Sequence, residues 1–218
     1  MANACRQHAR ARYHDAMKIF GDARSTNTRK VLTTLAELAM DYDLVHVDFA
    51  LGEHKSESHL ARQPFGQMPA LEDEGFVLYE SHAMCRYLND KAGGKLMPRE
   101  LHARALADQW MSIEAANVSG HAMKFVYHYL LQVPHESSVL EQAGAALDKA
   151  FTVMSQQLSK APFVAGQAFT LADICFMPYF EYMQLTPAQE LIAKHAPVLR
   201  WWNANRGRPS WRAVATRG

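Results

Sequence analysis

The spacing of apolar positions changes part-way along this chain, and the change predicts two different kinds of domain. Between residues 17 and 92, short apolar runs alternate with polar, turn-rich stretches. After residue 100, apolar residues recur at steps of three and four, which is the period of helices. The pattern predicts an α/β domain over residues 17–92, a linker over residues 93–99 and an all-helical domain over residues 100–218.

The α/β part begins with a strand, a helix and a second strand. "MKIF" and "DLVHVDF" are the strand candidates, and "RKVLTTLAELA" between them carries apolar residues at helical spacing. A β-α-β unit of this kind normally yields two parallel strands. In the second strand, regular alternation is expected to point Val45, Val47 and Phe49 to one side.

A hairpin and a further helix complete the α/β part. "MPALEDEGFVLY" predicts a hairpin with strands Ala70–Glu72 and Phe76–Tyr79, joined by a tight turn at Glu74-Gly75. The next stretch, "SHAMCRYLNDKA", has the spacing of a helix. The order β-α-β followed by β-β-α is typical of a thioredoxin-like domain.

The linker and the helical part have clear boundaries. "GGKLMPRE" (Gly93 to Glu100) contains two glycines and a proline, which interrupt both periods. Residues 101–131 are expected to form one long helix. In "FTLADIC", Thr170 and Asp173 have the spacing of a capping box, which predicts the start of another helix. We assign this signal to folding and to no chemistry.

Composition and charge exclude several classes of protein. The 218 residues are 49% hydrophobic and 21% charged, and Lys+Arg 23 against Asp+Glu 22 gives a net charge of +1. This balance offers no general attraction to nucleic acid or to an anionic membrane, and no apolar run approaches the roughly 18 residues of a membrane span. Three cysteines without a CxxC pair argue against a zinc cluster or a dithiol redox centre. They fit a reducing compartment, so we expect a cytoplasmic protein.

The first sixteen residues, "MANACRQHARARYHDA", differ from the rest of the chain. They contain three arginines and one acidic residue, and they show no sustained apolar period. Such a start can resemble an organellar transit peptide. We favour a disordered extension, or a non-native start with Met17 as the natural first residue.

Five short strings, in this order and spacing, resemble the glutathione S-transferase family. They are "GDARSTNTRKVL", "GEHKS", "QPFGQMPALED", "LYESHAMCRYL" and "FTLADICFMPYF", and together they span about nine tenths of the chain. The first two look most like the phi class and its bacterial relatives. The resemblance implies a thioredoxin-like N-terminal domain, an all-helical C-terminal domain, a homodimer and glutathione as co-substrate, with no permanently bound cofactor.

The resemblance also implies where glutathione binds. A cis peptide at Met68-Pro69 is expected to turn the backbone of Met68 toward the cysteinyl part of glutathione. Ser81, at a helix start, is expected to hold the α-carboxylate of the γ-glutamyl residue, because free N–H groups and positive potential favour an anion there. Glu80 is expected to pair with the ammonium group beside that carboxylate.

The other end of glutathione is a glycine carboxylate. The resemblance assigns this carboxylate to His54, Lys55 and Gln67, whose side chains can supply charge-assisted and neutral hydrogen-bond donors. An exposed His-Lys pair is by itself usually a solvated surface, so this assignment depends on the family pattern.

Four consecutive polar residues, Ser25, Thr26, Asn27 and Thr28, begin the first helix. Transfer of glutathione requires its thiolate, and a hydroxyl at a helix start can stabilise that charge without a general base. By resemblance the active-site serine is Ser25, with Thr26 as its rival, while Asn27 could offer an amide donor. Neither cysteine nor tyrosine is present in this stretch, so thioltransferase and tyrosine-type chemistry are disfavoured.

The helical part is expected to supply the pocket for the second substrate. We name Arg24, His121 and Phe125 as its residues, with Glu114 and His128 as further candidates. Glu114, His121 and His128 recur every seven residues and would share a face of one helix. They lie too far apart along a helix for a metal site, so we predict none. Arg24 could favour the thiolate, attract an acidic co-substrate or point to solvent.

The sequence therefore predicts a glutathione S-transferase that conjugates glutathione to small electrophiles, as in detoxification, or reduces hydroperoxides. The alternative is a catalytically silent binding or regulatory protein with the same fold.

Overall fold

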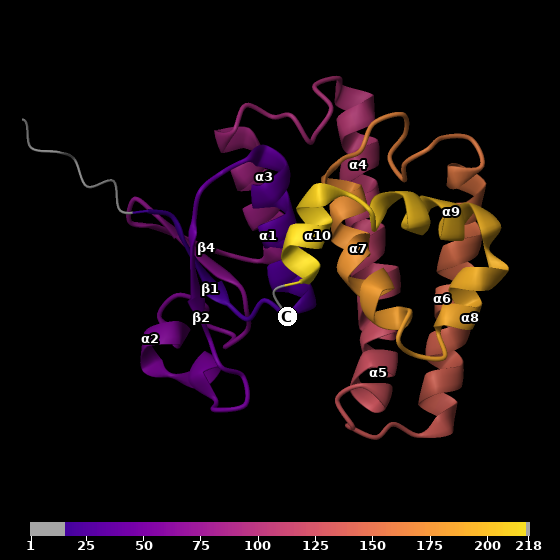
Figure 1. Cartoon of the computed structure of the whole chain (residues 1–218), viewed down its shortest axis with the longest axis horizontal. Coiled ribbons are helices and arrows are strands. Elements are labelled where there is room, and N and C mark those ends of the chain that lie inside the picture. The colour runs from indigo at the N-terminus through magenta and orange to yellow at the C-terminus, as the bar shows by residue number, and fades with distance from the viewer. Residues whose placement is uncertain (1–15, 217–218) are drawn as a thin grey trace, which may run out of the picture.

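The computed structural model describes residues 16–216, which form two domains side by side (Figure 1). Residues 1–15, nearly all of the predicted extension, lie outside the described residues. The first domain contains a four-stranded sheet in the order β2-β1-β3-β4, in which β1 pairs parallel with β2 and antiparallel with β3. Its strands are β1 (Lys18–Gly21), β2 (Asp43–His46), β3 (Ala70–Asp73) and β4 (Phe76–Tyr79).

The hairpin forms at the predicted turn, whereas β2 is shorter than expected. Glu74 and Gly75 have φ angles of 52° and 84°, as the mirror-image turns of two-residue hairpins require. β2 ends at His46, because the Asp48 carboxylate accepts hydrogen bonds from the next N–H groups along the chain and turns the backbone. The expectation that alternation continues to Phe49 is therefore wrong. Its ring is 61% exposed and stacks on another ring.

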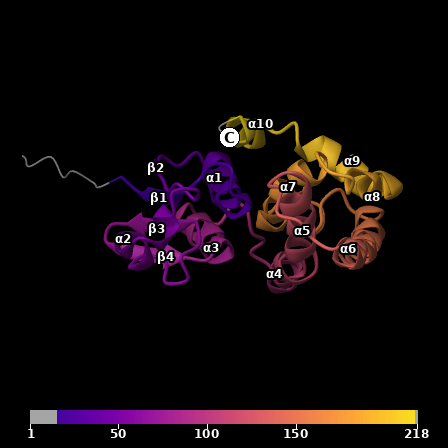
Figure 2. The same cartoon turned by 90° about the horizontal axis from the view of Figure 1, so that it is seen from below.

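Two helices separate the sheet from the second domain. They are α1 (Thr26–Leu38) and α3 (Ser81–Lys91), and α1 contacts α3, α7 and α10. The short helix α2 (Glu57–Leu60) and the 3-10 turn η1 (Glu53–Lys55) lie on the opposite side of the sheet (Figures 1 and 2). The start of α1 is therefore placed between the sheet and the helical domain.

The second domain is all-helical, and the predicted long first helix is divided. A π-helix, η2 (Ala115–Ser119), follows α4, so the heptad spacing of a continuous α-helix does not hold across it. None of the helices in the described range 16–216 is long and apolar enough to cross a membrane. The α-helices are α4 (Leu101–Glu114), α5 (Gly120–Tyr129), α6 (Ser137–Leu158), α7 (Leu171–Met183), α8 (Gln189–Lys194), α9 (Ala196–Asn205) and α10 (Pro209–Ala215).

One apolar core runs through both domains. Buried side chains of the sheet and α1, such as Ile19 and Leu35, belong to the same cluster as Phe176 and Trp202 of the helical domain. The predicted capping box is present at the start of α7, where Asp173 accepts hydrogen bonds from the backbone and side chain of the N-cap threonine. The predicted fold class, a thioredoxin-like domain joined to an all-helical domain, is confirmed.

Candidate functional site

A shallow polar hollow lies where the start of α1, the segment before β3 and the start of α3 meet. Five residues predicted from the sequence line it, and Asn27 and Gln63 join them. The sequence therefore placed residues from two separate segments around one site. The five predicted residues are Gln67, Met68, Pro69, Glu80 and Ser81.

The segment before β3 is held in place by polar side chains that the sequence reasoning missed. The Met68-Pro69 peptide is cis, as expected. The imidazole Nε2 of His59 lies 2.6 Å from the carbonyl oxygen of Gln67. Gln63 accepts a hydrogen bond from the Gln67 N–H at 3.2 Å. His59 and Gln63 are four residues apart, so the sequence could have shown that they share one side of a helical turn. Only the fold shows that this turn packs against the segment before β3.

Glu80 and Ser81 occupy the junction between β4 and α3. Glu80 has φ 71° and ψ 107°, a backbone conformation that non-glycine residues seldom adopt and that is often found at functional sites. Its side chain is exposed, whereas Ser81 is 8% exposed. The α3 start therefore presents its free N–H groups beside an exposed carboxylate. The α-amino acid end of a ligand would fit both, with its carboxylate at the N–H groups and its ammonium at the Glu80 carboxylate.

The four polar residues at the start of α1 point in different directions. Ser25 is the N-cap, and its Oγ accepts a hydrogen bond from the Thr28 N–H at 3.4 Å. Thr26 is 8% exposed and lies beside Tyr179 of α7. Thr28 is fully buried. Among these hydroxyls, that of Ser25 is half-exposed and keeps its own proton for another acceptor.

Arg24, next to Ser25, is folded back onto Asp22. Its guanidinium donates to both carboxylate oxygens, with the shortest contact 2.6 Å. Burial raises the pKa of Asp22, but the hydrogen bonds from Arg24 outweigh it and leave the pKa lowered. The carboxylate compensates the cation, so Arg24 neither stands as an isolated charge beside Ser25 nor points only to solvent.

His54 and Lys55, also predicted from the sequence, do not line the hollow. The ammonium of Lys55 donates to the Phe65 carbonyl at 3.0 Å, just before Gln67. The ring of His54 stacks on Phe49, with centroids 4.0 Å apart. The Lys55 side chain is thereby held beside the segment that ends in the cis proline, whereas the His54 ring packs on the loop after β2.

Comparison with known proteins assigns the family. The model of the glutathione S-transferase N-terminal domain matches residues 15–90, and that of the C-terminal domain matches residues 137–215. The probable glutathione S-transferase GSTF1 from Oryza sativa subsp. japonica is 32% identical over 208 residues, which cover 91% of this chain and 95% of that protein. The chain belongs to the glutathione S-transferase family.

Solved structures agree with this assignment. Glutathione transferase F7 from Populus trichocarpa matches with a TM-score of 0.87 at 31% identity, covering 92% of this chain and 98% of that one. Glutathione S-transferase I from mais, in complex with an atrazine glutathione conjugate, matches with a TM-score of 0.86 at 31% identity, covering 93% and 97%. The resemblance to plant F-type (phi-class) members, inferred from the sequence, is confirmed.

In this member of the family, the structure revises the candidates in the helical domain. Phe125 lies in the core, where its ring faces Gly144 of α6. Its assignment to the second-substrate pocket stays a prediction. His121 is partly buried, and burial lowers its pKa with a smaller effect of Lys124. Its role in that pocket stays a prediction.

Glu114 does not share a face with the two histidines, because the π-helix follows it. Its fully buried carboxylate accepts a hydrogen bond from Lys30 of α1 at 2.8 Å and lies 2.7 Å from the Nε2 of His82. Ligand-type atoms of His82, Glu114 and Cys175 lie within 4.8 Å of one another. The Lys30 ammonium already provides the positive charge there. This cluster therefore joins α1 and α3 of the glutathione S-transferase N-terminal domain to α4.

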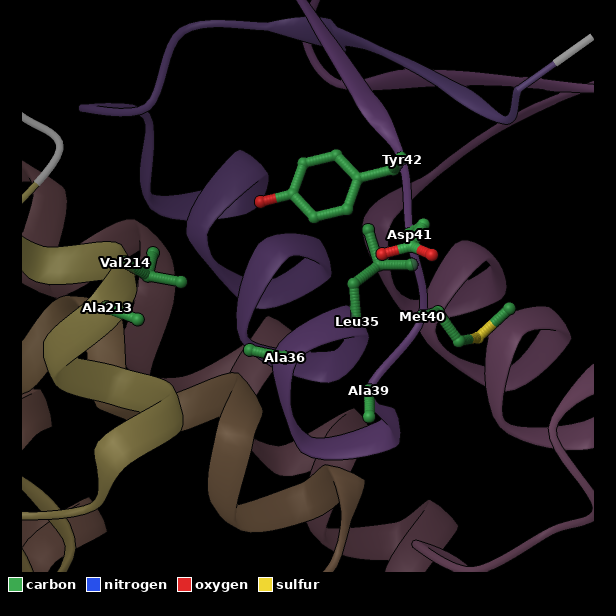
Figure 3. Close-up of a pocket in the computed structure, with 8 residues that line it drawn as sticks. All are labelled: Leu35, Ala36, Ala39, Met40, Asp41, Tyr42, Ala213 and Val214. Atoms are coloured by element: carbon green, nitrogen blue, oxygen red, sulfur yellow. The ribbon is translucent and has the colours of Figure 1, made fainter.

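A larger hollow of about 410 Å³ lies on another side of α1 (Figure 3). It is bounded by the end of α1, the segment before β2 and α10, and Asp41 and Tyr42 are its charged and aromatic members. Its lining has one carboxylate and no amide side chain, and it lies at the C-terminal ends of α1 and α10, where the helix dipole disfavours the two carboxylates of glutathione. The smaller hollow, at the starts of α1 and α3, is the better candidate for a glutathione site.

Proposed function

We propose that this protein is an active glutathione S-transferase that joins the thiolate of glutathione to small electrophiles. The thiolate sulfur forms the new bond to the electrophilic carbon, the leaving group departs with its electron pair, and the thiol proton passes to solvent. Support comes from the family, from the conjugate bound to the enzyme from mais and from the polar hollow. Reduction of hydroperoxides would use the same thiolate.

One observation carries the mechanism: the half-exposed hydroxyl of Ser25 at the tip of α1. Because its oxygen already accepts from the Thr28 N–H, its proton is oriented away from the helix and can be donated to the thiolate. A hydrogen bond to a charged group contributes about 1.5–3 kcal/mol, and the helix start adds about 0.3–1 kcal/mol. Lowering a thiol pKa by about two units requires about 3 kcal/mol. These contributions suffice without a general base.

The ends of glutathione fit the remaining residues. Glu80 and the α3 start at Ser81 would hold the ammonium and carboxylate of the γ-glutamyl residue, and the backbone of Met68 the cysteinyl part. The glycine carboxylate would then lie toward His54, Lys55 and Gln67. This direction leaves the sulfur near the start of α1.

The test compares Ser25→Ala with Thr26→Ala. We expect Ser25→Ala to raise the pKa of bound glutathione by about one to two units and to lower conjugation of an aryl halide at neutral pH by about 10- to 100-fold. Thiolate absorbance gives the pKa, and glutathione-affinity retention reports binding. Thr26→Ala should alter neither reading strongly, because its hydroxyl faces Tyr179.

Three results would contradict this function. Full activity of Ser25→Ala together with loss in Thr26→Ala would move the thiolate contact to Thr26. Retention on glutathione without turnover of any electrophile would favour a silent binding protein. Failure of the wild type to be retained on the glutathione matrix would show that glutathione is not the co-substrate.

The predicted homodimer belongs to the same proposal. Large apolar side chains are exposed on both domains, and a contiguous patch of such side chains would mark a surface for a partner. Sedimentation of the full chain at several concentrations tests it, with a mass of one subunit as the contrary result. The exposed residues at issue are Phe49, Leu51, Phe65, Phe76, Val77, Leu101 and Leu106.

A further inference from the structure

Asn27 connects the glutathione hollow to the helical domain. Its side-chain oxygen Oδ1 accepts a hydrogen bond from the Ser81 hydroxyl at 3.3 Å and another from the Tyr179 hydroxyl at 3.3 Å. Ser81 begins α3, whereas Tyr179 comes from α7. The amide therefore receives one bond from each domain, while its other end lies in the lining of the hollow.

The surroundings of Tyr179 determine which way this amide is turned. Tyr179 is 2% exposed, and burial raises the pKa of its hydroxyl, which keeps its proton. The Tyr179 hydroxyl donates that proton to Asn27 at 3.3 Å. The atom of Asn27 that faces Tyr179 must then be the acceptor Oδ1.

The opposite atom, Nδ2, is a donor without a protein acceptor. Among the residues that the structure describes, none accepts a hydrogen bond from it. A half-buried amide that is fixed at its oxygen and unused at its nitrogen is prepared for an acceptor on a ligand. The neighbouring Glu80 carboxylate is the group that the proposed function assigns to the ligand's ammonium.

Two arguments favour a carboxylate at the α3 start over the sulfur as that acceptor. First, Asn27 contacts Ser81 directly, and the backbone N–H groups that begin α3 attract an anion to the same place. Second, the proton of the Ser81 hydroxyl is donated to Asn27, so this hydroxyl is left as an acceptor. A carboxylate there needs a side-chain donor from elsewhere, and Nδ2 supplies it.

We propose that Asn27 donates through Nδ2 to the α-carboxylate of the γ-glutamyl residue of glutathione, and that Tyr179 is the residue that positions it. This inference rests on the proposed function, since it assigns a further ligand contact within the same site. It also makes the helical domain part of glutathione recognition, although Tyr179 itself does not touch the ligand.

The test combines protein variants with two glutathione analogues in titration calorimetry. In 4-aminobutanoyl-Cys-Gly the α-carboxylate is missing, and in glutaryl-Cys-Gly the α-ammonium is missing. We expect Asn27→Ala to weaken binding of glutathione and of glutaryl-Cys-Gly by about 10-fold or more, the effect of one hydrogen bond to a charged group. Binding of 4-aminobutanoyl-Cys-Gly should change less than about twofold.

Asn27→Asp provides a second measurement that preserves the size of the side chain. Its carboxylate should repel the ligand's carboxylate, so glutathione and glutaryl-Cys-Gly should bind still more weakly, while 4-aminobutanoyl-Cys-Gly should not. Tyr179→Phe should weaken glutathione by a smaller factor of about 3- to 10-fold, again only for ligands that carry the carboxylate. Tyr182→Phe is the matched control, because it removes an interdomain hydroxyl that bonds to the Arg24 carbonyl and not to Asn27.

The outcomes separate this inference from the function on which it rests. An equal loss for all three ligands in Asn27→Ala would place Asn27 at the sulfur or at another part of glutathione and overturn the inference, while glutathione binding by the wild type would stand. No loss in Asn27→Ala would overturn it as well. Absence of glutathione binding in the wild type would overturn both.

Discussion

Two fully buried carboxylates of the helical domain are satisfied in opposite ways. Asp173 lies within one domain and is surrounded by neutral donors: the backbone N–H groups of Thr170 and Val164, the Thr170 hydroxyl and the indole of Trp201, at 2.8–3.2 Å. Glu114 lies at the domain interface and is paired with the Lys30 ammonium across it.

Asp173 therefore organises one domain, whereas Glu114 holds the two domains together. Neutral hydrogen bonds compensate the lost hydration of Asp173 only in part, and burial raises its pKa to about 6. At the interface, the pKa of Lys30 is raised: burial lowers it, but Glu114 outweighs that effect. Lys30 therefore stays charged, and its counter-charge depends on the other domain being in place.

The largest effect is expected from breaking the interface pair. Glu114→Gln keeps the shape of the side chain but leaves the Lys30 ammonium buried without a counter-charge. We expect it to lower the free energy of unfolding by about 3–5 kcal/mol. Urea unfolding followed by circular dichroism measures the change.

The control for this prediction is the double variant Lys30→Met with Glu114→Gln. It removes both charges, so most of the lost stability should return. A double variant as unstable as Glu114→Gln would mean that the ion pair itself, and not the unpaired charge, accounts for the loss.

The next effect is a pH dependence that belongs to Asp173. Its pKa is about 6 in the folded chain against an ordinary 3.8, so the folded state binds its proton more tightly. The resulting stability is fully present below about pH 3.8 and is lost as pH rises through about 6, a change of about 3 kcal/mol. Unfolding of wild type and Asp173→Asn between pH 4 and 7 measures it as the difference between the two curves. A difference that does not vary with pH would show that Asp173 has the same pKa in both states.

The two carboxylates also show what the sequence could and could not reveal. The capping box at Thr170 and Asp173 was predicted, because the two residues are three positions apart and their contact is set by local helix geometry. The hairpin at Glu74-Gly75 was predicted for the same reason. The partner of Glu114 was not, since Lys30 is 84 positions away and the pairing depends on how the domains pack.

The candidate site also contains residues that the sequence predicted and residues whose role depends on how distant segments pack. Two separate strings predicted five residues of the hollow, because a resemblance to a family carries long-range information that periodicity does not. Asn27 was considered only as an amide donor in general, and its orientation depends on Tyr179, which no sequence pattern connects to it. The helical period marked the apolar face that carries Phe125, but it could not show that Gly144 of α6 lies against it.

A third carboxylate, Glu80, sharpens the comparison because it is exposed at the glutathione hollow. If its partner is the ligand's ammonium, Glu80→Gln should weaken glutathione binding by about tenfold and leave the unfolding midpoint unchanged. Calorimetric titration with glutathione and with glutaryl-Cys-Gly measures this. The variant and the wild type should bind glutaryl-Cys-Gly, which lacks the ammonium, about equally. An equal loss of affinity for both ligands would show that Glu80 does not contact the ammonium.

The smallest effect concerns a polar group that is neither satisfied nor functional. The Thr28 hydroxyl is fully buried, has no hydrogen-bond partner within residues 16–216 and lies against Gly21 and not toward the hollow. Thr28→Val replaces this hydroxyl by a methyl group of similar size, so it removes a desolvated polar atom without leaving a cavity. We expect a stabilisation of about 1 kcal/mol, measured by urea unfolding, and glutathione affinity within twofold of the wild type. Destabilisation would show that the hydroxyl has a partner. A large loss of affinity would show that all four polar residues at the start of α1, and not only those that face the hollow, serve the ligand.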